Sequence, residues 1–539
     1  MKILLLVTAF NSQTQAVYTK LKDSLHEVSV CFHRVEEQTL KEIEAFEPEL
    51  ILCPFLKSYI SSQIYDAYPV YIFHPGPRGD RGPHSLEYAL QSHTKKWGLV
   101  VLRANSELDG GDIYAEESFC VRETYKASLY RQEIVRASLD ALDSLFVNIE
   151  KENFIAQELN PTHESLNAEQ RGINWLHDTT QVIINKIYLS DSLPGVLDEI
   201  LGISCYLFGV HKEDKLKGKP KDIIAKRDGA ICIGTIDGAV WITYLKPLGG
   251  FKLPATYVLK EKLQGIKEER IPLVFDRSYD TFYEVSVKMR DNVGYLYFNF
   301  HNGAMSTAQC IRLKYAIEYL KTECEVLVLM GGEDFFSNGI HLNILEDSQK
   351  QGEDGWANIN AMNDVVSAIL YADEVLTVAS FSSNAGAGGV FMGIACDYVV
   401  GEEGVVLNPH YKTLGLSGSE YHTYTLPKRV GEEISQSLLA ECLPISVTYA
   451  LSIGMLDKVF VHSDYLESLH AFAVSKFSDE FLWDKEEYLE ENRALIEALK
   501  EKELEVMHPE FWDEKSEFHA LRYEFVYKVC PECTPLRLK

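Results

Sequence analysis

Short apolar runs alternate with longer amphipathic stretches along the N-terminal part of the chain. In the amphipathic stretches, such as Thr14–Leu25, apolar positions recur with the period of a helix. The apolar runs have the length and the β-branched content of buried strands: Ile3–Val7, Leu50–Cys53, Val70–Phe73 and Leu99–Leu102. This alternation predicts a Rossmann-like α/β domain with a parallel sheet over residues 1–160.

The pattern changes after residue 160. One helical segment, Glu169–Tyr188, precedes short strands that are separated by glycine turns, among them Ala230–Gly234 and Ala239–Tyr244. Short strands at close spacing are typical of small barrels and sandwiches. We therefore expect a small β-rich, OB-like module over residues 161–275.

A second α/β pattern follows over residues 276–478. It begins with a strand at Val293–Phe300, a helix at Thr307–Leu320 and a further strand at Val326–Met330. After it, residues 479–539 are charged and have a helical pattern over Glu486–Val506, which predicts a C-terminal helical tail that docks on the rest of the protein. The chain as a whole is expected to be an α/β multidomain protein.

Composition and charge narrow the class of protein. With 46% hydrophobic and 24% charged residues, the chain of 539 residues has the composition of a soluble globular protein with several cores. Its 80 acidic and 52 basic residues give a formal net charge of −28. This charge argues against a nucleic-acid partner, because affinity for phosphates is built from clustered Lys and Arg. No apolar run reaches the roughly 18 residues of a membrane span, so no membrane-spanning segment is expected.

Cysteine usage bears on compartment and on metal binding. The 11 cysteines are spread singly except for Cys530 and Cys533, which favours a reducing cytoplasm over a secreted disulfide framework. The apolar run at the N-terminus is brief and is interpreted as a buried strand, not as a signal peptide. Because Cys530 and Cys533 supply only two of the four ligands of a structural zinc site, we predict no metal site.

Two segments of the first domain carry groups suited to proton transfer. One contains His74 at a strand end, and the other contains Asp109 next to two glycines. A histidine that is unprotonated near neutral pH acts as a base, and a carboxylate beside it fixes its tautomer. Glycine turns let a ligand approach the backbone. These segments therefore predict a proton-transfer site.

The same segments resemble the formyltransferases that use formyltetrahydrofolate, whose hallmark is Asn-x-His-Pro-Ser, a downstream Arg-Gly and a later Leu-Asp-x-Gly. The match covers the order and spacing of Ile72-Phe73-His74-Pro75-Gly76, Arg81-Gly82 and Leu108-Asp109-Gly110-Gly111. The resemblance implies that His74 is the catalytic histidine and Asp109 its acidic partner. It also implies a folate pocket formed by Ile72, Arg81, Gly82 and Gly111.

One position departs from this formyltransferase pattern. The family's catalytic Asn, which donates a hydrogen bond to the formyl oxygen, falls on Ile72. Losing one donor to a developing oxyanion costs about 3 kcal/mol. Either the chemistry is altered or another donor substitutes, and Arg78, Asp80 and Arg81 are the polar candidates nearby.

Two glycine-rich turns of the third domain expose backbone N–H groups. Gly331–Leu342 follows one apolar strand, and Ser383–Asp397 follows another. Where such a turn opens a helix, its first N–H groups lack partners and direct the positive end of the helix dipole toward a developing oxyanion. The two turns together predict an oxyanion hole.

These turns resemble the enoyl-CoA hydratase/isomerase (crotonase) superfamily over roughly Ser286–Val461. The resemblance implies that the backbone N–H groups of Asn338 and Gly388 bind the carbonyl oxygen of a coenzyme A thioester. The neighbouring residues of the predicted coenzyme A site are Gly339, Gly389 and Phe391.

Departures from the crotonase pattern bear on the reaction. A hydratase uses two Glu residues to activate water, but here the first falls on Phe391 and the second on His410 or Tyr411. Ordinary hydration is therefore not expected. Tyr411 and Glu420 lie nine residues apart around a glycine turn. As a weak acid and a carboxylate, they are predicted to handle a proton on a small acyl group.

Residues 161–275 resemble the C-terminal domain of methionyl-tRNA formyltransferase. The combination of all the domains resembles the HypX/HoxX family of NiFe-hydrogenase maturation proteins along nearly the whole chain. The resemblance implies a bifunctional formyltransferase and formyl-CoA decarbonylase. Such an enzyme transfers a formyl group from formyltetrahydrofolate to coenzyme A and releases carbon monoxide for the hydrogenase active site. Hydrogenase maturation proteins are the implied partners.

Two other hypotheses fit the same residues. The first is a deformylase that releases formate, with the crotonase-like domain binding coenzyme A as a sensor. The second is a non-enzymatic scaffold that delivers a one-carbon ligand to a maturation partner. Ile72, Phe391 and the missing Glu pair favour the scaffold.

Overall fold

The computed structural model describes residues 1–275 and 277–539, which form two compact units. The first unit contains Met1–Arg270, Arg277–Phe282 and Pro531–Lys539, and most of the second is Tyr283–Cys530. The predicted domain boundary at residue 276 lies outside the described residues. Each unit is described by itself.

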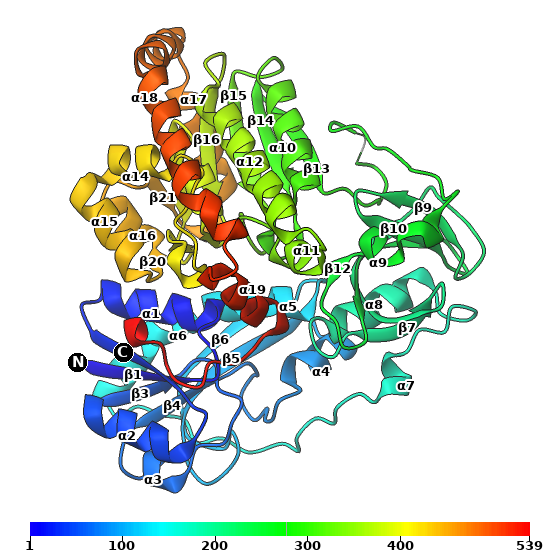
Figure 1. Ribbon diagram of the computed structural model, residues 1–539. Coiled ribbons are helices and arrows are strands. Elements are labelled where there is room, and N and C mark those ends of the chain that lie inside the picture. Colours follow the sequence, from blue (N-terminus) through cyan, green and yellow to red (C-terminus); the bar gives the residue numbers. More distant parts are fainter. Residues whose placement is uncertain (276) are drawn as a thin grey trace. The chain divides into compact units, whose positions relative to one another are not determined.

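The first unit opens with a six-stranded sheet in the order β2-β1-β3-β4-β5-β6 (Figure 1). Its strands are β1 (Lys2–Val7), β2 (Glu27–Phe32), β3 (Leu50–Cys53), β4 (Val70–His74), β5 (Lys96–Arg103) and β6 (Ile113–Cys120). The helices of this part are α1 (Ser12–Asp23), α2 (Glu36–Phe46), α3 (Ser62–Tyr65), α4 (Ser85–Gln91), α5 (Lys126–Arg131) and α6 (Glu133–Glu150).

Strand direction in this sheet is mixed. The first four strands in spatial order are parallel, as predicted, but β5 runs antiparallel to β4, and β6 runs antiparallel to β5. The prediction of a parallel sheet is therefore wrong at this edge. No helix separates β5 from β6, and a direct connection between neighbouring strands produces an antiparallel pair.

The strands of this sheet have apolar side chains on both faces, and helices therefore cover both faces. Leu4 and Leu6 of β1 pack with Ile43 of α2 and Ile64 of α3 in one buried cluster. The C-terminal segment of the chain also belongs to this unit. Thr534 accepts a hydrogen bond from the backbone N–H of Phe32 at 2.8 Å, next to the short helix η5 (Leu536–Leu538).

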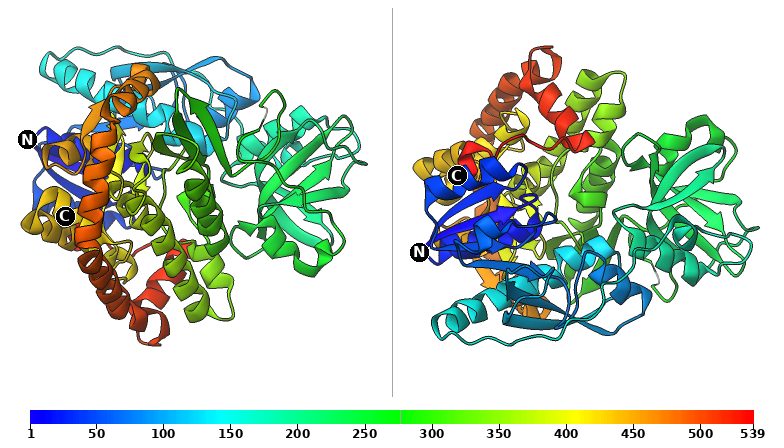
Figure 2. Two further views of the ribbon diagram at one scale, coloured as in Figure 1. Left: turned by 90° about the horizontal axis from the view of Figure 1, so that it is seen from above. Right: turned by 90° about the horizontal axis from the view of Figure 1, so that it is seen from below.

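The rest of the first unit is the predicted β-rich module. Its strands pair in the order β7-β8-β11-β10-β9, all antiparallel, and the sheet is green in both views of Figure 2. The strands are β7 (Val196–Ile200), β8 (Ile203–Glu213), β9 (Ile223–Arg227), β10 (Ala230–Gly234), β11 (Ala239–Pro247) and β12 (Leu253–Pro254). The helices are α7 (Ala168–Arg171), α8 (Thr180–Ser190), α9 (Ala255–Leu259) and η1 (Lys260–Leu263).

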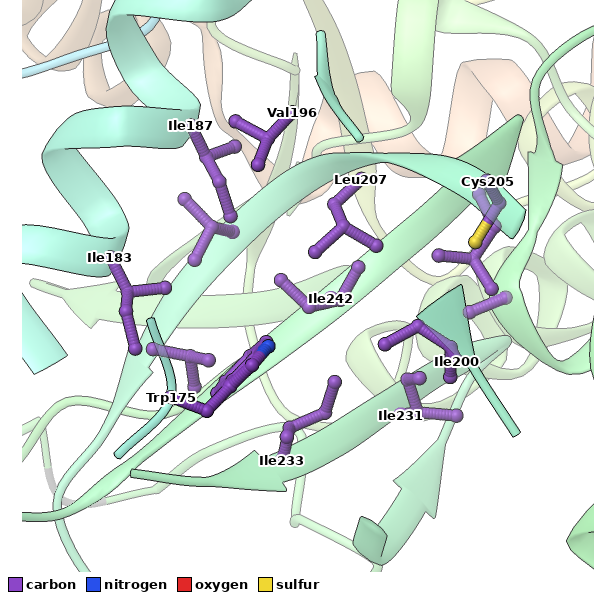
Figure 3. Packing of buried hydrophobic residues seen from close by; sticks show 14 of the residues in the cluster. Trp175, Ile183, Ile187, Val196, Ile200, Cys205, Leu207, Ile231, Ile233 and Ile242 are labelled. Atoms are coloured by element: carbon purple, nitrogen blue, oxygen red, sulfur yellow. The ribbon is translucent and has the colours of Figure 1, made fainter. Parts of the chain in front are cut away.

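The core of the module lies between α8 and the sheet. Ile183 and Ile187 of α8 point toward Leu207 and Ile242 of the sheet (Figure 3). The single predicted helix over Glu169–Tyr188 is instead two helices. The first ends at Gly172, whose backbone is extended, and the second begins where the Thr179 side chain accepts a hydrogen bond from the N–H of Val182.

The second unit is built on a sheet with the order β13-β14-β15-β16-β18-β21, which is parallel from β14 onward. Its strands are β13 (Val285–Arg290), β14 (Val293–Phe298), β15 (Val326–Gly331), β16 (Leu376–Phe381), β18 (Tyr398–Glu402) and β21 (Lys458–Phe460). A smaller sheet pairs β17 (Ala385–Gly386), β19 (Val406–Asn408) and β20 (Ile445–Ser446).

Helices make up much of the remaining second unit. They are η2 (His301–Gly303), α10 (Thr307–Leu320), α11 (Leu342–Asp347), α12 (Gln351–Leu370), α13 (Gly388–Ile394), η3 (Lys412–Leu414), α14 (His422–Val430), α15 (Glu432–Glu441), α16 (Val447–Ser452), η4 (His462–Asp464), α17 (Tyr465–Lys476), α18 (Asp479–Trp512) and α19 (Glu517–Tyr527). The long helix α18, orange to red in Figure 1, packs against α12 and α14. None of the helices in the described ranges combines the length and apolarity that crossing a bilayer requires.

Candidate functional site

His74 is the last residue of β4, where it pairs with Val100 of β5, while the pairing of β4 with β3 ends two residues earlier at Ile72. Its ring is buried, with 4% of the residue exposed. Nε2 lies 2.7 Å from Oδ2 of Asp80, and Nδ1 lies 3.5 Å from Oδ2 of Asp109. The first unit therefore gathers one histidine and two carboxylates at the end of a strand.

The sequence interpretation assigned Asp109 as the acidic partner and mentioned Asp80 only as a nearby polar group. Asp80 makes the shorter contact, at hydrogen-bond distance from His74. Asp109, with a positive φ of 49°, accepts a hydrogen bond from the backbone N–H of Gly82 at 2.9 Å. Asp109 thus lies near His74, as expected, and also ties its own loop to the loop that carries Asp80.

Glycines allow these groups to approach one another. A Cβ atom added to Gly76 would lie 2.0 Å from Oδ2 of Asp80 and 2.6 Å from Nε2 of His74. A Cβ on Gly111 would lie 1.7 Å from the carbonyl oxygen of Arg103. Gly111 is therefore required by the backbone itself, and its predicted role in a folate pocket stays a prediction.

A third group on Asp80 was not foreseen. Nε2 of His163 lies 2.6 Å from Oδ1 of Asp80, so each carboxylate oxygen faces one histidine. Burial alone would raise the pKa of Asp80, but the hydrogen bonds from His74, Ser85 and His163 outweigh it and hold the pKa below its ordinary value. Asp80 is thus an ionised acceptor. No motif marked His163, because it stands in a loop far along the chain.

The other predicted residues of the first site have structural contacts of their own. Ile72 packs into apolar clusters of the sheet and brings no polar atom that could replace the missing Asn. Arg81 donates from Nε to the carbonyl oxygen of Leu108 at 3.1 Å. Gly82 has a positive φ of 92°, a conformation that favours glycine.

In the second unit, the two predicted glycine turns pack directly against each other. The N–H of Gly386 donates to the carbonyl oxygen of Ser337 at 2.9 Å. A Cβ on Gly339 would lie 3.4 Å from the backbone nitrogen of Gly388, and a Cβ on Gly389 would lie 2.1 Å from the carbonyl oxygen of Ser337. The close approach requires glycine at position 389, whereas Gly339 is favoured by its positive φ of 79°.

The prediction for Asn338 is wrong. Its backbone N–H already donates to the carbonyl oxygen of Gly303 at 2.8 Å, so it is not free to bind a thioester carbonyl. Gly388, by contrast, begins α13, and its N–H makes no hydrogen bond within the described residues. In the first turn, the N–H of Ile340 is likewise unbonded within residues 1–275 and 277–539. Ile340 and Gly388 are therefore the candidate donors.

Tyr411 and Glu420 meet beside Gly388, as the sequence suggested. The Tyr411 hydroxyl lies 2.7 Å from Oε2 of Glu420, and a Cβ on Gly388 would lie 2.8 Å from the Cδ of Glu420. Only 1% of Glu420 is exposed. Burial raises the pKa of Glu420, and burial together with the neighbouring carboxylate raises that of Tyr411. The pair is thus a buried phenol beside a carboxyl group with elevated proton affinity.

Aromatic side chains pack against Tyr411 of this pair. Phe391, fully buried on α13, stacks on the Tyr411 ring at a centroid distance of 4.9 Å and an interplanar angle of 15°. His422 packs edge-on against the rings of both Phe391 and Tyr411. Phe391, where the resemblance to hydratases predicts a water-activating Glu, thus presents an apolar ring to Tyr411.

Helix α18 holds the loop that carries Glu420. The Glu503 carboxylate accepts hydrogen bonds from the N–H groups of Tyr421 and Thr423 and lies 3.2 Å from Nδ1 of His422. Burial lowers the pKa of His422, but its contact with Glu503 outweighs this and raises the pKa above its ordinary value. The sequence interpretation missed Glu503, which looks like one more charged residue of a polar helix.

Metal-binding groups are not gathered anywhere in the described chain. No cluster of three or more His, Cys, Asp or Glu side chains suited to a metal ion occurs within residues 1–275 and 277–539. Cys530 and Cys533 are exposed free thiols.

Comparison with known proteins covers both units. The family model for enoyl-CoA hydratase/isomerase matches residues 292–480, and that for the C-terminal domain of formyl transferases matches residues 165–263. Methionyl-tRNA formyltransferase of Mesoplasma florum is 22% identical over 193 residues, covering 35% of this chain and 61% of the relative.

Two relatives span the chain. The hydrogenase maturation factor HoxX of Bradyrhizobium diazoefficiens is 34% identical over 555 residues, covering 100% of this chain and 97% of the relative. The crystal structure of HypX from Aquifex aeolicus in complex with tetrahydrofolic acid is 40% identical, with a TM-score of 0.96 over 100% of this chain and 98% of that one. Because these similarities extend over its whole length, the chain belongs to the HypX/HoxX family of hydrogenase maturation factors.

Proposed function

We propose that this protein makes carbon monoxide for the maturation of a NiFe-hydrogenase. In this proposal a formyl group passes from formyltetrahydrofolate to the thiol of coenzyme A, and the resulting formyl-CoA is split into carbon monoxide and coenzyme A. The observation that carries the proposal is the buried Tyr411–Glu420 pair, which lies beside the unbonded N–H of Gly388 where a hydratase would activate water.

In the first step, the formyl transfer, His74 acts as the base. Because Asp80 accepts from Nε2, the lone pair of a neutral ring is on Nδ1, which takes the proton of the coenzyme A thiol. The sulfur then forms a bond to the formyl carbon, the bond from that carbon to the folate nitrogen breaks, and the same proton passes to the nitrogen. Asp80 stabilises the imidazolium while the proton is on His74.

In the second step, the splitting of formyl-CoA, Glu420 acts as the base and Tyr411 as the acid. Glu420 removes the formyl proton, and the electrons of that C–H bond become the lone pair of carbon monoxide. The carbon–sulfur bond breaks with its electrons on sulfur, which receives the hydroxyl proton of Tyr411. Glu420 then returns its proton to Tyr411 across their 2.7 Å contact, so the step is redox-neutral. A raised pKa supports this role, because it makes the carboxylate a better base near neutral pH.

The surroundings of this pair support carbon monoxide release over hydrolysis. Phe391 and Tyr411 carry no carboxylate, so the pair of Glu residues with which a hydratase activates water is absent at these positions, and the nearby Glu420 is hydrogen-bonded to the Tyr411 hydroxyl. The candidate donors Ile340 and Gly388 are suited to polarise the thioester carbonyl. Both formyltetrahydrofolate and coenzyme A are substrates in this scheme, and proteins that assemble the hydrogenase active site are the proposed partners.

The test is to incubate the purified protein with carbon-labelled formyltetrahydrofolate, with and without coenzyme A, trapping gas with deoxyhaemoglobin and assaying formate. Labelled carbon monoxide that depends on coenzyme A is the expected result. Labelled formate alone, independent of coenzyme A, would replace the proposal by a deformylase. Neither product, with the folate still bound, would replace it by a one-carbon delivery scaffold.

A further inference from the structure

The segment that connects the first sheet to the β-rich module reaches into the formyl-transfer site. Gln157 accepts a hydrogen bond from the N–H of Gly79 at 3.0 Å and donates to the carbonyl oxygens of Asp109 and Gly111 at 3.0 and 2.8 Å. The N–H of Asn160 donates to the carbonyl oxygen of Gly79 at 3.1 Å. The segment therefore joins the two loops that carry Asp80 and Asp109.

His163 follows in this segment and is held in two ways. Its Nε2 lies 2.6 Å from Oδ1 of Asp80, and its ring stacks on Tyr88 of α4 at 3.8 Å with an interplanar angle of 7°. The side chain is 22% exposed, against 4% for that of Asp80. The stacking fixes the plane of the ring, and the hydrogen bond fixes its direction.

The contacts of Asp80 determine which atoms carry hydrogen. A carboxylate only accepts hydrogen bonds, so both histidines donate to it from Nε2. In neutral rings this leaves Nδ1 of His74 as its basic nitrogen. A carboxylate held at one oxygen can rotate, whereas one held at both oxygens keeps its geometry toward His74.

We propose that His163 is a positioning residue of the formyl-transfer site: it anchors Oδ1 of Asp80, so that Oδ2 keeps His74 in the tautomer with an unprotonated Nδ1. The inference rests on the proposed function for the reaction that His74 performs. It makes the connecting segment part of the active site, because Asp80 loses its hydrogen bond at Oδ1 without this residue.

The first test measures tetrahydrofolate release in the presence of coenzyme A for His163→Ala, His163→Gln and the control Glu164→Ala. Glu164 is exposed in the same segment. We expect His163→Ala to lower kcat about tenfold to a hundredfold with little change in the KM for formyltetrahydrofolate, which is the usual size of such effects. The Gln variant, whose amide still donates to Asp80, should keep most of the activity, and added imidazole should partly restore the Ala variant.

Three kinetic results would overturn the proposal. They are wild-type kcat in His163→Ala, an equal loss in Glu164→Ala, which would indicate linker packing alone, and a loss in His163→Gln as large as in His163→Ala without imidazole rescue.

A second test needs no turnover and so separates this inference from the proposed function. Protein labelled with ¹⁵N-histidine reports the tautomer of each ring, and His74→Asn identifies the signals of His74. The expected result is protonated Nε2 in the wild-type protein and a mixture of tautomers in His163→Ala. An unchanged tautomer would refute the inference even if carbon monoxide is produced, and a changed tautomer would support it even if none is.

Discussion

Each unit places one buried carboxyl group beside a glycine, yet the two groups have opposite proton affinities. Asp80 in the first unit faces a histidine nitrogen at each oxygen, and its pKa is lowered. Glu420 in the second unit faces a phenol and lies among apolar rings, and its pKa is raised. Burial raises the pKa of both groups, but the histidines beside Asp80 outweigh it, whereas Glu420 has the Glu503 carboxylate nearby, which raises its pKa further.

This difference matches two tasks. A carboxylate that stays ionised stabilises a neighbouring imidazolium and fixes its tautomer, whereas a carboxylate with a raised pKa is suited to accept a proton itself. The comparison predicts that the two groups respond differently to the same kind of substitution.

The largest expected effect is that of Glu420→Gln. The amide preserves the size of the side chain but accepts no proton, so carbon monoxide formation from supplied formyl-CoA should fall about a hundredfold to ten-thousandfold. Tetrahydrofolate release, which depends on His74, should change little. Gas trapping and a folate assay on one preparation measure both rates. The exposed Glu433→Gln is the matched control. Wild-type carbon monoxide yield in Glu420→Gln would remove this residue from the mechanism.

Asp80→Asn should slow tetrahydrofolate release and not carbon monoxide formation from formyl-CoA, the reverse of Glu420→Gln. One end of the amide is a donor and cannot accept from a histidine, so either His74 or His163 loses its partner. We expect tetrahydrofolate release to fall about a hundredfold or more, since a wrong tautomer of a catalytic histidine is costly. The rate from supplied formyl-CoA should be unaffected. Asp112→Asn, on the exposed part of the neighbouring loop, serves as the control. Equal losses in both assays would mean that Asp80 supports folding of the whole chain.

Glu503→Gln should have a smaller effect on the second site. The carboxylate of α18 holds the backbone of Tyr421 and Thr423 and raises the pKa of His422 against the effect of burial, without a proposed contact to the acyl group. We expect carbon monoxide formation to fall about tenfold through displacement of the loop that carries Glu420. Glu505→Gln, exposed on the same helix, controls for the charge of α18. No loss in Glu503→Gln would mean that this loop keeps its conformation without the ion pair.

Local pattern predicted much of the fold. The strands Leu50–Cys53 and Ala230–Gly234 and the helix Thr307–Leu320 have the predicted bounds, because each is set by an apolar period between clear capping or turn residues. Strand direction is a different kind of property. β5 is antiparallel to β4 even though α4 lies in their connection, and β6 is antiparallel to β5 with no helix between them, so an apolar run contains no information about the direction of these strands.

The candidate sites were predicted where a motif stands at a strand end, as for His74 and Gly388. They were missed where a single polar residue arrives from a distant segment, as His163 and Glu503 do. The error at Asn338 has a third cause. Within one tight turn, which N–H is free depends on backbone dihedral angles, so the donor moves two residues to Ile340 without any change in the motif.

The smallest predicted effect is the difference in how the two carboxyl groups couple stability to pH. The folded pKa of Glu420 is above its unfolded value, so wild-type stability falls relative to Glu420→Gln as pH rises through the raised pKa. The folded pKa of Asp80 is below its unfolded value, so its stabilising contribution is complete above that unfolded value and is lost only as pH falls through the lowered pKa. Melting temperatures of the three proteins at a series of pH values from mildly acidic to mildly alkaline test this. The gap between wild type and Glu420→Gln should shrink or grow steadily as pH rises through the raised pKa of Glu420, while the gap between wild type and Asp80→Asn should change only where the histidines that contact Asp80 gain or lose a proton. If both gaps vary alike, the two carboxyl groups do not differ in protonation and the assignment of a base to only one of them fails.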